Sequence, residues 1–265
     1  MNRIEEKFKE LREEGKHALI AYVTCGDPDI DTTKKIIKIL VEAGVDLIEL
    51  GMPFSDPLAD GPTIQMASSI ALKNNISLNR VLSLARDIRK SVSIPLVIMS
   101  YYNPIFHYGI RNFISEAKKS HIDGLIIPDL PPEEAHQIEM FARKMNIDTI
   151  YFISPTSTNR RINTIIKHSK GFIYYLSLTG VTGERKTLPE GIKKDIIKIK
   201  RLTNKPVCVG FGISSADQVK DICQIADGVI VGSAIINRIH QDKSKTGIFE
   251  DVKSFVKKLA DAAHR

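Results

Sequence analysis

Short apolar runs rich in β-branched residues recur along the chain, and a segment of helical period follows each of them. The eight runs occupy residues 18–25, 46–50, 95–101, 124–128, 149–153, 172–177, 206–211 and 227–232. The segments between them, such as TTKKIIKILVEAG and PEEAHQIEMFARKM, place apolar residues at i, i+3, i+4 and i+7. The pattern therefore predicts eight strands, each followed by an amphipathic helix.

The strand runs are continuously apolar, which indicates burial on both faces and a parallel sheet. Eight parallel strands ringed by helices form a TIM (β/α)8 barrel, and 265 residues is close to the usual length of that fold. The charged segment MNRIEEKFKELREEGK predicts an extra N-terminal helix, and no low-complexity segment divides the chain. We therefore expect a single barrel domain over residues 1–265, with a doubly wound open sheet as the alternative.

The composition is 43% apolar and 26% charged, which is typical of a globular protein with a full core. No run approaches the roughly 20 apolar residues of a membrane span, and the N-terminus is not signal-like, so we expect a cytoplasmic protein. Cys25, Cys208 and Cys223 form no CxxC pair and lie in or near apolar runs, which predicts buried thiols.

The formal net charge of +7 raises the question of a nucleic-acid partner. The lysines are spread over helix faces such as EGIKKDIIKIKRLTNK, without interleaved aromatic residues. This distribution favours a solvated basic surface over nucleic-acid binding. Attraction of an anionic substrate is a further interpretation.

Glu49 stands inside the apolar run DLIEL, near the end where barrel active sites are built. Alternation along the strand places it on the same face as Leu47. If that face points into the barrel, burial raises the pKa of the carboxyl and allows proton exchange near neutral pH. The alternative is a structural glutamate paired with a Lys or Arg, although no strand run contains either residue.

The connection at residues 51–62 is longer than most βα loops and carries Asp56 and Asp60. Asp-Pro and Asp-Gly dipeptides mark turns, and Asp60 could instead cap the next helix. If Asp60 lies across the loop from Glu49, two carboxyl groups in different environments can divide acid and electrostatic roles. A second long loop, at residues 178–189, is also expected to cover a ligand.

Glycine-rich turns follow the last strands. Gly210 and Gly212 follow the seventh run, Gly232 and Ser233 follow the eighth, and GVTG (180–183) follows the sixth. Backbone N–H groups and helix N-termini can converge there, and such barrels commonly bind phosphate after strands 7 and 8. The turns favour a phosphorylated substrate, and the alternative is that the glycines merely end strands.

Other side chains favour neither lysine-based nor metal-assisted chemistry, because no strand ends in Lys and the seven histidines are scattered. His107, the only one near the expected active face, is predicted to lie on a loop surface. Tyr175 shares a strand face with Ile173 and Ser177, and a packed barrel tyrosine is the simplest interpretation.

Eight motifs, in order over essentially the whole chain, closely resemble the tryptophan synthase alpha subunit family. They are YVTCGDPD, GVDLIELGMPFSDPLADGPTIQ, YYNPIF, GLIIPDLPPEE, SPTST, LTGVTG, GFGISS and VIVGSAII. GVTG alone is a weak signal, whereas ELGMPFSDPLADGP followed by GVTG and GFGIS is highly specific. Cys25 and Asp129 depart from residues more common in the family, which puts the local shape of the pocket in question.

The resemblance implies a carbon–carbon lyase of tryptophan biosynthesis that cleaves indole-3-glycerol phosphate to indole and glyceraldehyde 3-phosphate. In this reverse aldol reaction the protonated indole ring accepts the electrons of the breaking bond, so neither metal nor cofactor is expected in this chain. By motif, Glu49 is the acid/base and Asp60 the partner of the indole N–H.

The resemblance also implies substrate contacts. Tyr22, Ser100 and Ile153 are expected around the indole ring and Tyr175 near the glycerol or indole. The phosphate is expected at Gly183, Phe211, Gly212, Gly232 and Ser233, mostly on backbone N–H groups. Thr182 is expected on a lid that contacts Asp60 when closed.

A partner follows from the resemblance as well. The family docks on a pyridoxal-phosphate beta subunit that receives indole through a tunnel, in an α2β2 heterotetramer, and the loops after strands 2 and 6 are the expected contact surface. Two other functions stay open at this point: a non-catalytic activator of a beta-type partner, or another phosphate-binding barrel isomerase or epimerase.

Overall fold

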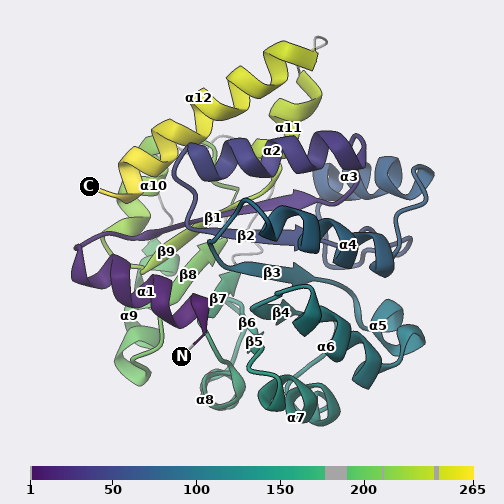
Figure 1. Ribbon diagram of the computed structural model, residues 1–265. Coiled ribbons are helices and arrows are strands. Elements are labelled where there is room, and N and C mark those ends of the chain that lie inside the picture. The colour runs from purple at the N-terminus through teal and green to yellow at the C-terminus, as the bar shows by residue number, and fades with distance from the viewer. Residues whose placement is uncertain (1, 177–189, 211, 242–244) are drawn as a thin grey trace.

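The computed structural model describes residues 2–176, 190–210, 212–241 and 245–265. Figure 1 shows helices wrapped around a curled sheet. The strands are β1 (Ala18–Thr24), β2 (Leu47–Gly51), β3 (Leu96–Met99), β4 (Gly124–Ile126), β5 (Asp148–Ile150), β6 (Phe152–Ile153), β7 (Ile173–Leu176), β8 (Val207–Gly210) and β9 (Gly228–Val231). The helices are α1 (Arg3–Glu13), α2 (Ile30–Glu42), α3 (Pro62–Lys73), α4 (Leu78–Arg89), α5 (Tyr102–Tyr108), α6 (Ile110–Lys119), α7 (His136–Lys144), α8 (Asn159–His168), α9 (Glu190–Leu202), α10 (Ala216–Cys223), α11 (Ser233–Gln241) and α12 (Lys245–Ala263).

The sheet is a parallel barrel that is nearly closed. Its strand order is β5-β4-β3-β2-β1-β9-β8-β7-β6, and every pairing is parallel. The two ends of that order, β5 and β6, are consecutive pieces of chain separated only by Tyr151. They are two halves of the fifth predicted strand, so the barrel is confirmed and the open doubly wound sheet is wrong.

Two apolar layers hold the barrel together. Inside it, inward-facing residues of the strands form one cluster with Ile4, Phe8 and Leu11 of α1, which packs on this interior. The predicted N-terminal helix is thereby confirmed; Asn2 caps it, and a capping box with Glu5 satisfies its first N–H groups. The larger outer cluster lies between the strands and the surrounding helices. Because both layers exclude water, the strands are apolar on both faces.

Aspartates anchor the N-terminal ends of several strands. Asp46, Asp123 and Asp227 each precede a strand and accept a backbone N–H from a neighbouring one. The donors are Leu19, Leu96 and Val207, at 2.9, 2.9 and 2.8 Å respectively. These bonds tie adjacent strand starts together, and so help to fix the heights at which the strands end at the opposite rim.

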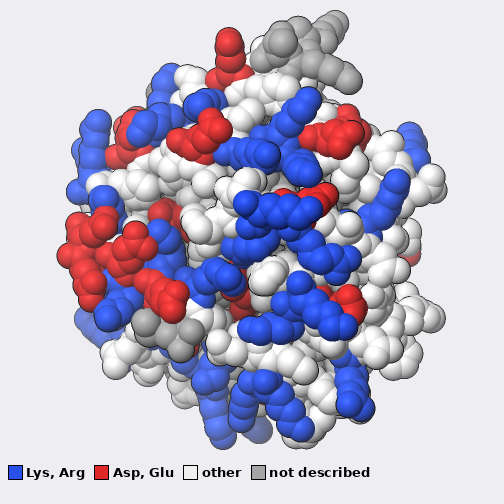
Figure 2. Space-filling model, in the orientation of Figure 1, with Lys and Arg blue, Asp and Glu red and all other residues white. Residues whose placement is uncertain are grey.

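The surface is basic but mixed. Figure 2 shows Lys and Arg side chains scattered over one face among uncharged and acidic residues. Cys25, Cys208 and Cys223 are buried free thiols, as predicted. Among the described helices, none has the length and apolar character needed to cross a bilayer.

Candidate active site

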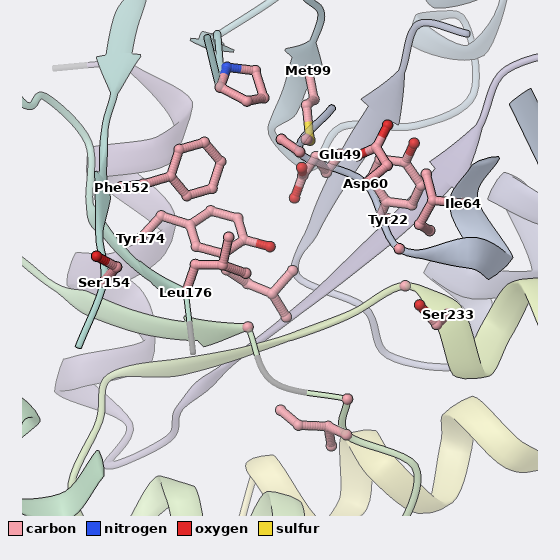
Figure 3. Close-up of a pocket in the computed structure, with 18 of the residues that line it drawn as sticks. Tyr22, Glu49, Asp60, Ile64, Met99, Phe152, Ser154, Tyr174, Leu176 and Ser233 are labelled. Atoms are coloured by element: carbon pink, nitrogen blue, oxygen red, sulfur yellow. The ribbon is translucent and has the colours of Figure 1, made fainter. Parts of the chain in front are cut away.

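A cavity of about 680 Å³ lies where the strands end, and both predicted acids, Glu49 and Asp60, line it. Figure 3 shows their side chains beside Tyr22 and Met99, with Phe152 and Tyr174 across the space. The opening is at the carboxyl ends of the strands, the face on which barrel enzymes build their active sites.

Glu49 points into the barrel. It lies in register with Tyr22 of β1 and Val97 of β3, and it is only 1% exposed. Neither carboxylate oxygen has a hydrogen-bond partner among the described residues, so pairing with a barrel Lys or Arg is not found there. Burial, with the charge of Asp60 as a lesser cause, raises the pKa of Glu49 to about 8. At neutral pH this side chain is a neutral acid.

Asp60 reaches the same cavity from the loop between β2 and α3. It does not cap α3, whose N-cap residue is Gly61. The Tyr101 hydroxyl bonds the Asp60 carboxyl and accepts the Ala59 N–H at 2.9 Å, and Phe54 stacks on the Tyr101 ring. Burial raises the pKa of Asp60 to about 6, and the Tyr101 hydrogen bond opposes that rise. Asp60 is therefore largely ionised at neutral pH.

Asp56, in the same loop, has no such environment. Its side chain accepts a hydrogen bond from Ser55 at 2.6 Å and is exposed. Its carbonyl accepts the Leu58 N–H, which closes a turn. The turn interpretation of Asp56 is confirmed.

Two glycines give space to aromatic rings. A Cβ on Gly51 would lie 2.1 Å from the Tyr22 hydroxyl oxygen, and one on Gly210 would lie 2.6 Å from Cε1 of Tyr174. Tyr22, which is expected around the indole ring, lines the cavity. Gly210 keeps room for the Tyr174 ring, a role different from the phosphate turn predicted for it.

Two of the other predicted glycine turns, at Gly212 and Gly232, also border the cavity. Gly212 has φ +33°, and among the described residues, its chain neighbours apart, no atom lies within 4 Å of the position that a Cβ would take, so the backbone there is open to a ligand. Gly232 and Ser233 line the cavity where α11 begins, and Asn237 projects from the next turn. First-turn N–H groups of a helix have no intrahelical partner and bind anions readily. Asn237 carried no signal in the sequence beyond its spacing from Ser233.

Three residues expected around the substrate do not line the cavity. Ile153 and Tyr175 belong to the outer cluster, where the Tyr175 hydroxyl donates to Asp195 of α9 at 2.7 Å. Ser100 is buried beyond the end of β3 and bonds the Tyr101 carbonyl. None of the three lines the cavity among the described residues.

The residue just before each of them lines the cavity instead. These residues are Met99, Phe152 and Tyr174. Successive strand side chains point to opposite faces, so an error of one position reverses the assignment. The pairing of Phe152 with Tyr174 and of Ile153 with Tyr175 shows the two faces side by side.

Other expected residues have different outcomes. Thr182, Gly183 and Phe211 lie outside the described residues. Cys25 is buried in the outer cluster, and Asp129 accepts the Tyr102 N–H at 2.8 Å, at the start of α5. Neither of these departures from the family pattern lines the cavity.

A buried, neutral carboxyl at the mouth of a parallel barrel, beside an ionised one, places the chain among the (β/α)8-barrel enzymes that work by acid–base catalysis. The family profile described as tryptophan synthase alpha chain matches residues 8–264. The chain belongs to the tryptophan synthase alpha chain family, whose known role is the cleavage of indole-3-glycerol phosphate by a lyase-type reaction.

Individual relatives agree over nearly the whole chain. The tryptophan synthase alpha chain of Thermoanaerobacter sp. strain X514 is 47% identical over 261 residues, which cover 98% of this chain and 99% of that protein. The crystal structure of tryptophan synthase subunit alpha from Legionella pneumophila strain Paris has a TM-score of 0.92 at 35% identity, and the match covers 99% of this chain and 98% of that one. An aminoacrylate-bound tryptophan synthase from M. tuberculosis has a TM-score of 0.89 at 31% identity, with 99% and 100% covered.

Proposed function

We propose that Glu49 and Asp60 carry the cleavage of indole-3-glycerol phosphate in this chain. The observation that carries the proposal is the Glu49 carboxyl, which is buried, has no hydrogen-bond partner among the described residues and has a pKa of about 8. It holds a proton at neutral pH and faces a cavity rather than a structural partner. Such a group is suited to deliver a proton to an otherwise weakly basic carbon.

The reaction balances with this one acid. Glu49 gives its proton to C3 of the indole ring, which leaves a positive charge on the ring nitrogen. The C3 to glycerol carbon bond then breaks, and its electron pair restores the aromatic ring. The glycerol hydroxyl becomes the aldehyde of glyceraldehyde 3-phosphate, and the Glu49 carboxylate takes up the hydroxyl proton. The acid returns to its starting state.

Asp60 supplies the charge that the intermediate needs. Its carboxylate, ionised above about pH 6, would accept the indole N–H and stabilise the cation on that nitrogen. Tyr101 holds the Asp60 side chain and the adjacent backbone together. The phosphate would bind in the same cavity at the Gly212 backbone, which is open, and at Gly232 and Ser233, where α11 begins.

We also propose a beta subunit as the partner, in an α2β2 assembly, with pyridoxal phosphate held by that subunit and no cofactor in this chain. Leu58 of the β2–α3 loop is 93% exposed and Phe106 of α5 is 59% exposed. Large apolar side chains this exposed favour a docking surface beside the cavity, through which indole could pass without entering water. We expect this assembly to work in the cytoplasm.

The test is indole release from indole-3-glycerol phosphate by the purified chain, alone and saturated with a beta subunit. Glu49→Gln should lower kcat at least 10²- to 10⁴-fold, because the amide cannot deliver a proton. Asp56→Asn, an exposed acid of the neighbouring loop, is the matched control and should keep normal turnover.

Three outcomes would overturn the proposal. No indole release by the wild-type chain, even with the beta subunit, would favour a non-catalytic activator. Turnover of a sugar phosphate without an indole ring would favour an isomerase or epimerase. Near-normal turnover of Glu49→Gln would remove Glu49 from the mechanism.

A further inference from the structure

The cavity that would receive a phosphate dianion is lined by an ionised carboxylate and by a guanidinium. Asp60, ionised at neutral pH, repels such a substrate. Among the described residues that line the cavity, Arg161 is the only positively charged one. A single cation on a partly enclosed surface acts more strongly than the same charge on an open one, because the protein concentrates its field in the cleft.

Arg161 is held at the rim by its position in α8. It is the third residue of that helix, and its N–H donates to the N-cap residue Thr158 at 3.3 Å. Ser154 and Ser157, in the turn that leads from β6 to α8, line the cavity beside it, and the Ser154 N–H donates to the Ser157 hydroxyl at 3.0 Å. The side chain of Arg161 therefore projects from a well-defined polar corner.

Among the residues that the structure describes, the guanidinium pairs only with Glu133, which is itself exposed. Nη1 of Arg161 lies 2.5 and 2.6 Å from the two carboxylate oxygens of Glu133, in the turn before α7. The side chains are 37% and 52% exposed. Ion pairs with this much solvent contact contribute little to stability, so a doubly charged phosphate can compete with Glu133 for the guanidinium.

We infer that Arg161 attracts the phosphate group of the substrate into the cavity and that Glu133 competes with the substrate for this guanidinium. The inference rests on the proposed function and adds to it a residue that selects for a phosphorylated substrate. Arg161 acts on substrate capture and takes no part in proton transfer at Glu49.

Substitutions of Arg161 and of Glu133 should change kcat/KM for indole-3-glycerol phosphate in opposite directions at low ionic strength. Arg161→Met should lower it about three- to tenfold with kcat nearly unchanged, because only capture is weakened. Glu133→Gln should raise it, because the guanidinium is released to the substrate. Arg161→Lys should recover part of the loss, and Arg160→Met, an exposed neighbour outside the cavity, is the matched control for net charge.

Two further measurements separate attraction from structure. The difference between wild type and Arg161→Met should shrink toward zero as salt rises to about 1 M, where charges are screened within a few ångströms. It should also vanish with indole-3-glycerol, which lacks the phosphate. Thermal unfolding of each variant tests whether the fold is retained.

The inference is overturned if Arg161→Met behaves like Arg160→Met, or if Glu133→Gln lowers kcat/KM as Arg161→Met does, which would make the ion pair structural. It is also overturned if the loss persists at high salt or with indole-3-glycerol. Failure of the proposed function is distinguishable, because then no variant and no wild-type sample releases indole.

Discussion

The buried acid at position 49 should make the protein less stable as the pH rises. In the unfolded chain a glutamate releases its proton near pH 4.5, whereas in the folded chain Glu49 keeps it until about pH 8. Between these values the folded state binds more protons than the unfolded state, so the free energy of unfolding falls with increasing pH. The sign is opposite to that of an ion-paired carboxylate.

The size of the effect follows from the two pKa values. At about 1.4 kcal/mol for each pH unit, the interval from 4.5 to about 8 corresponds to a loss of about 5 kcal/mol, of which about 3 kcal/mol is reached by pH 7. Glu49 is 1% exposed, so little solvent screening reduces it. Glu49→Gln removes the titration, so the free energy of unfolding of the variant relative to wild type should rise by these amounts as the pH increases from about 4.5, while activity is lost.

Urea unfolding of wild type and Glu49→Gln from about pH 5 to about pH 8.5 measures the difference between their free energies of unfolding. The burial of an unpaired amide affects the variant equally at every pH. The informative quantity is therefore the increase of this free-energy difference with rising pH. Glu6→Gln, on the exposed side of α1, controls for the change in net charge. A difference that stays constant with pH would refute the assignment of Glu49 as a buried, protonated acid.

Three other predictions concern the same cavity. The kcat/KM of the free enzyme should fall below about pH 6, where Asp60 is protonated, and above about pH 8, where Glu49 loses its proton; a flat profile would contradict these roles. Tyr101→Phe removes the hydrogen bond that lowers the pKa of Asp60, so the acidic limb of this profile should move to higher pH; a uniform loss at every pH would be inconsistent. Gly210→Ala should lower the free energy of unfolding in urea by about 1–3 kcal/mol, and it should lower activity because the added methyl group pushes the Tyr174 ring into the cavity. Gly191→Ala, whose added Cβ meets no atom of the described residues within 4 Å apart from its own helix backbone and chain neighbours, is its control, and equal stability of the two variants would argue against this packing.

The barrel fold could be predicted from the sequence. Eight continuously apolar runs alternating with amphipathic segments indicate parallel strands buried on both faces, because only helices on the outside and packed side chains inside exclude water from both. Glu49 was readable for a related reason. A charged residue inside such a run marks its own face, since an acid on the helix-covered side would have lost water without gaining a ligand space.

The sequence did not show which residues of the wholly apolar strands point into the barrel. In IYYL of β7 either tyrosine can point inward, and the same is true of FI in β6 and of the end of β3. A run that is apolar on both faces has no alternation to show which residues point in, so the barrel register decides it. Ser100, Ile153 and Tyr175 were each misplaced by one position for this reason.

The chain's residue pattern was therefore enough to establish the kind of fold, the acid at position 49 and the family, because strand and helix periods and local motifs are properties of neighbouring residues. Only the folded arrangement shows that Tyr174 replaces Tyr175 in the cavity, that Tyr101 holds Asp60, and that Arg161 meets Glu133 at the rim. These contacts join segments far apart in the chain, and they depend on strand register and loop path, which no short stretch of sequence encodes.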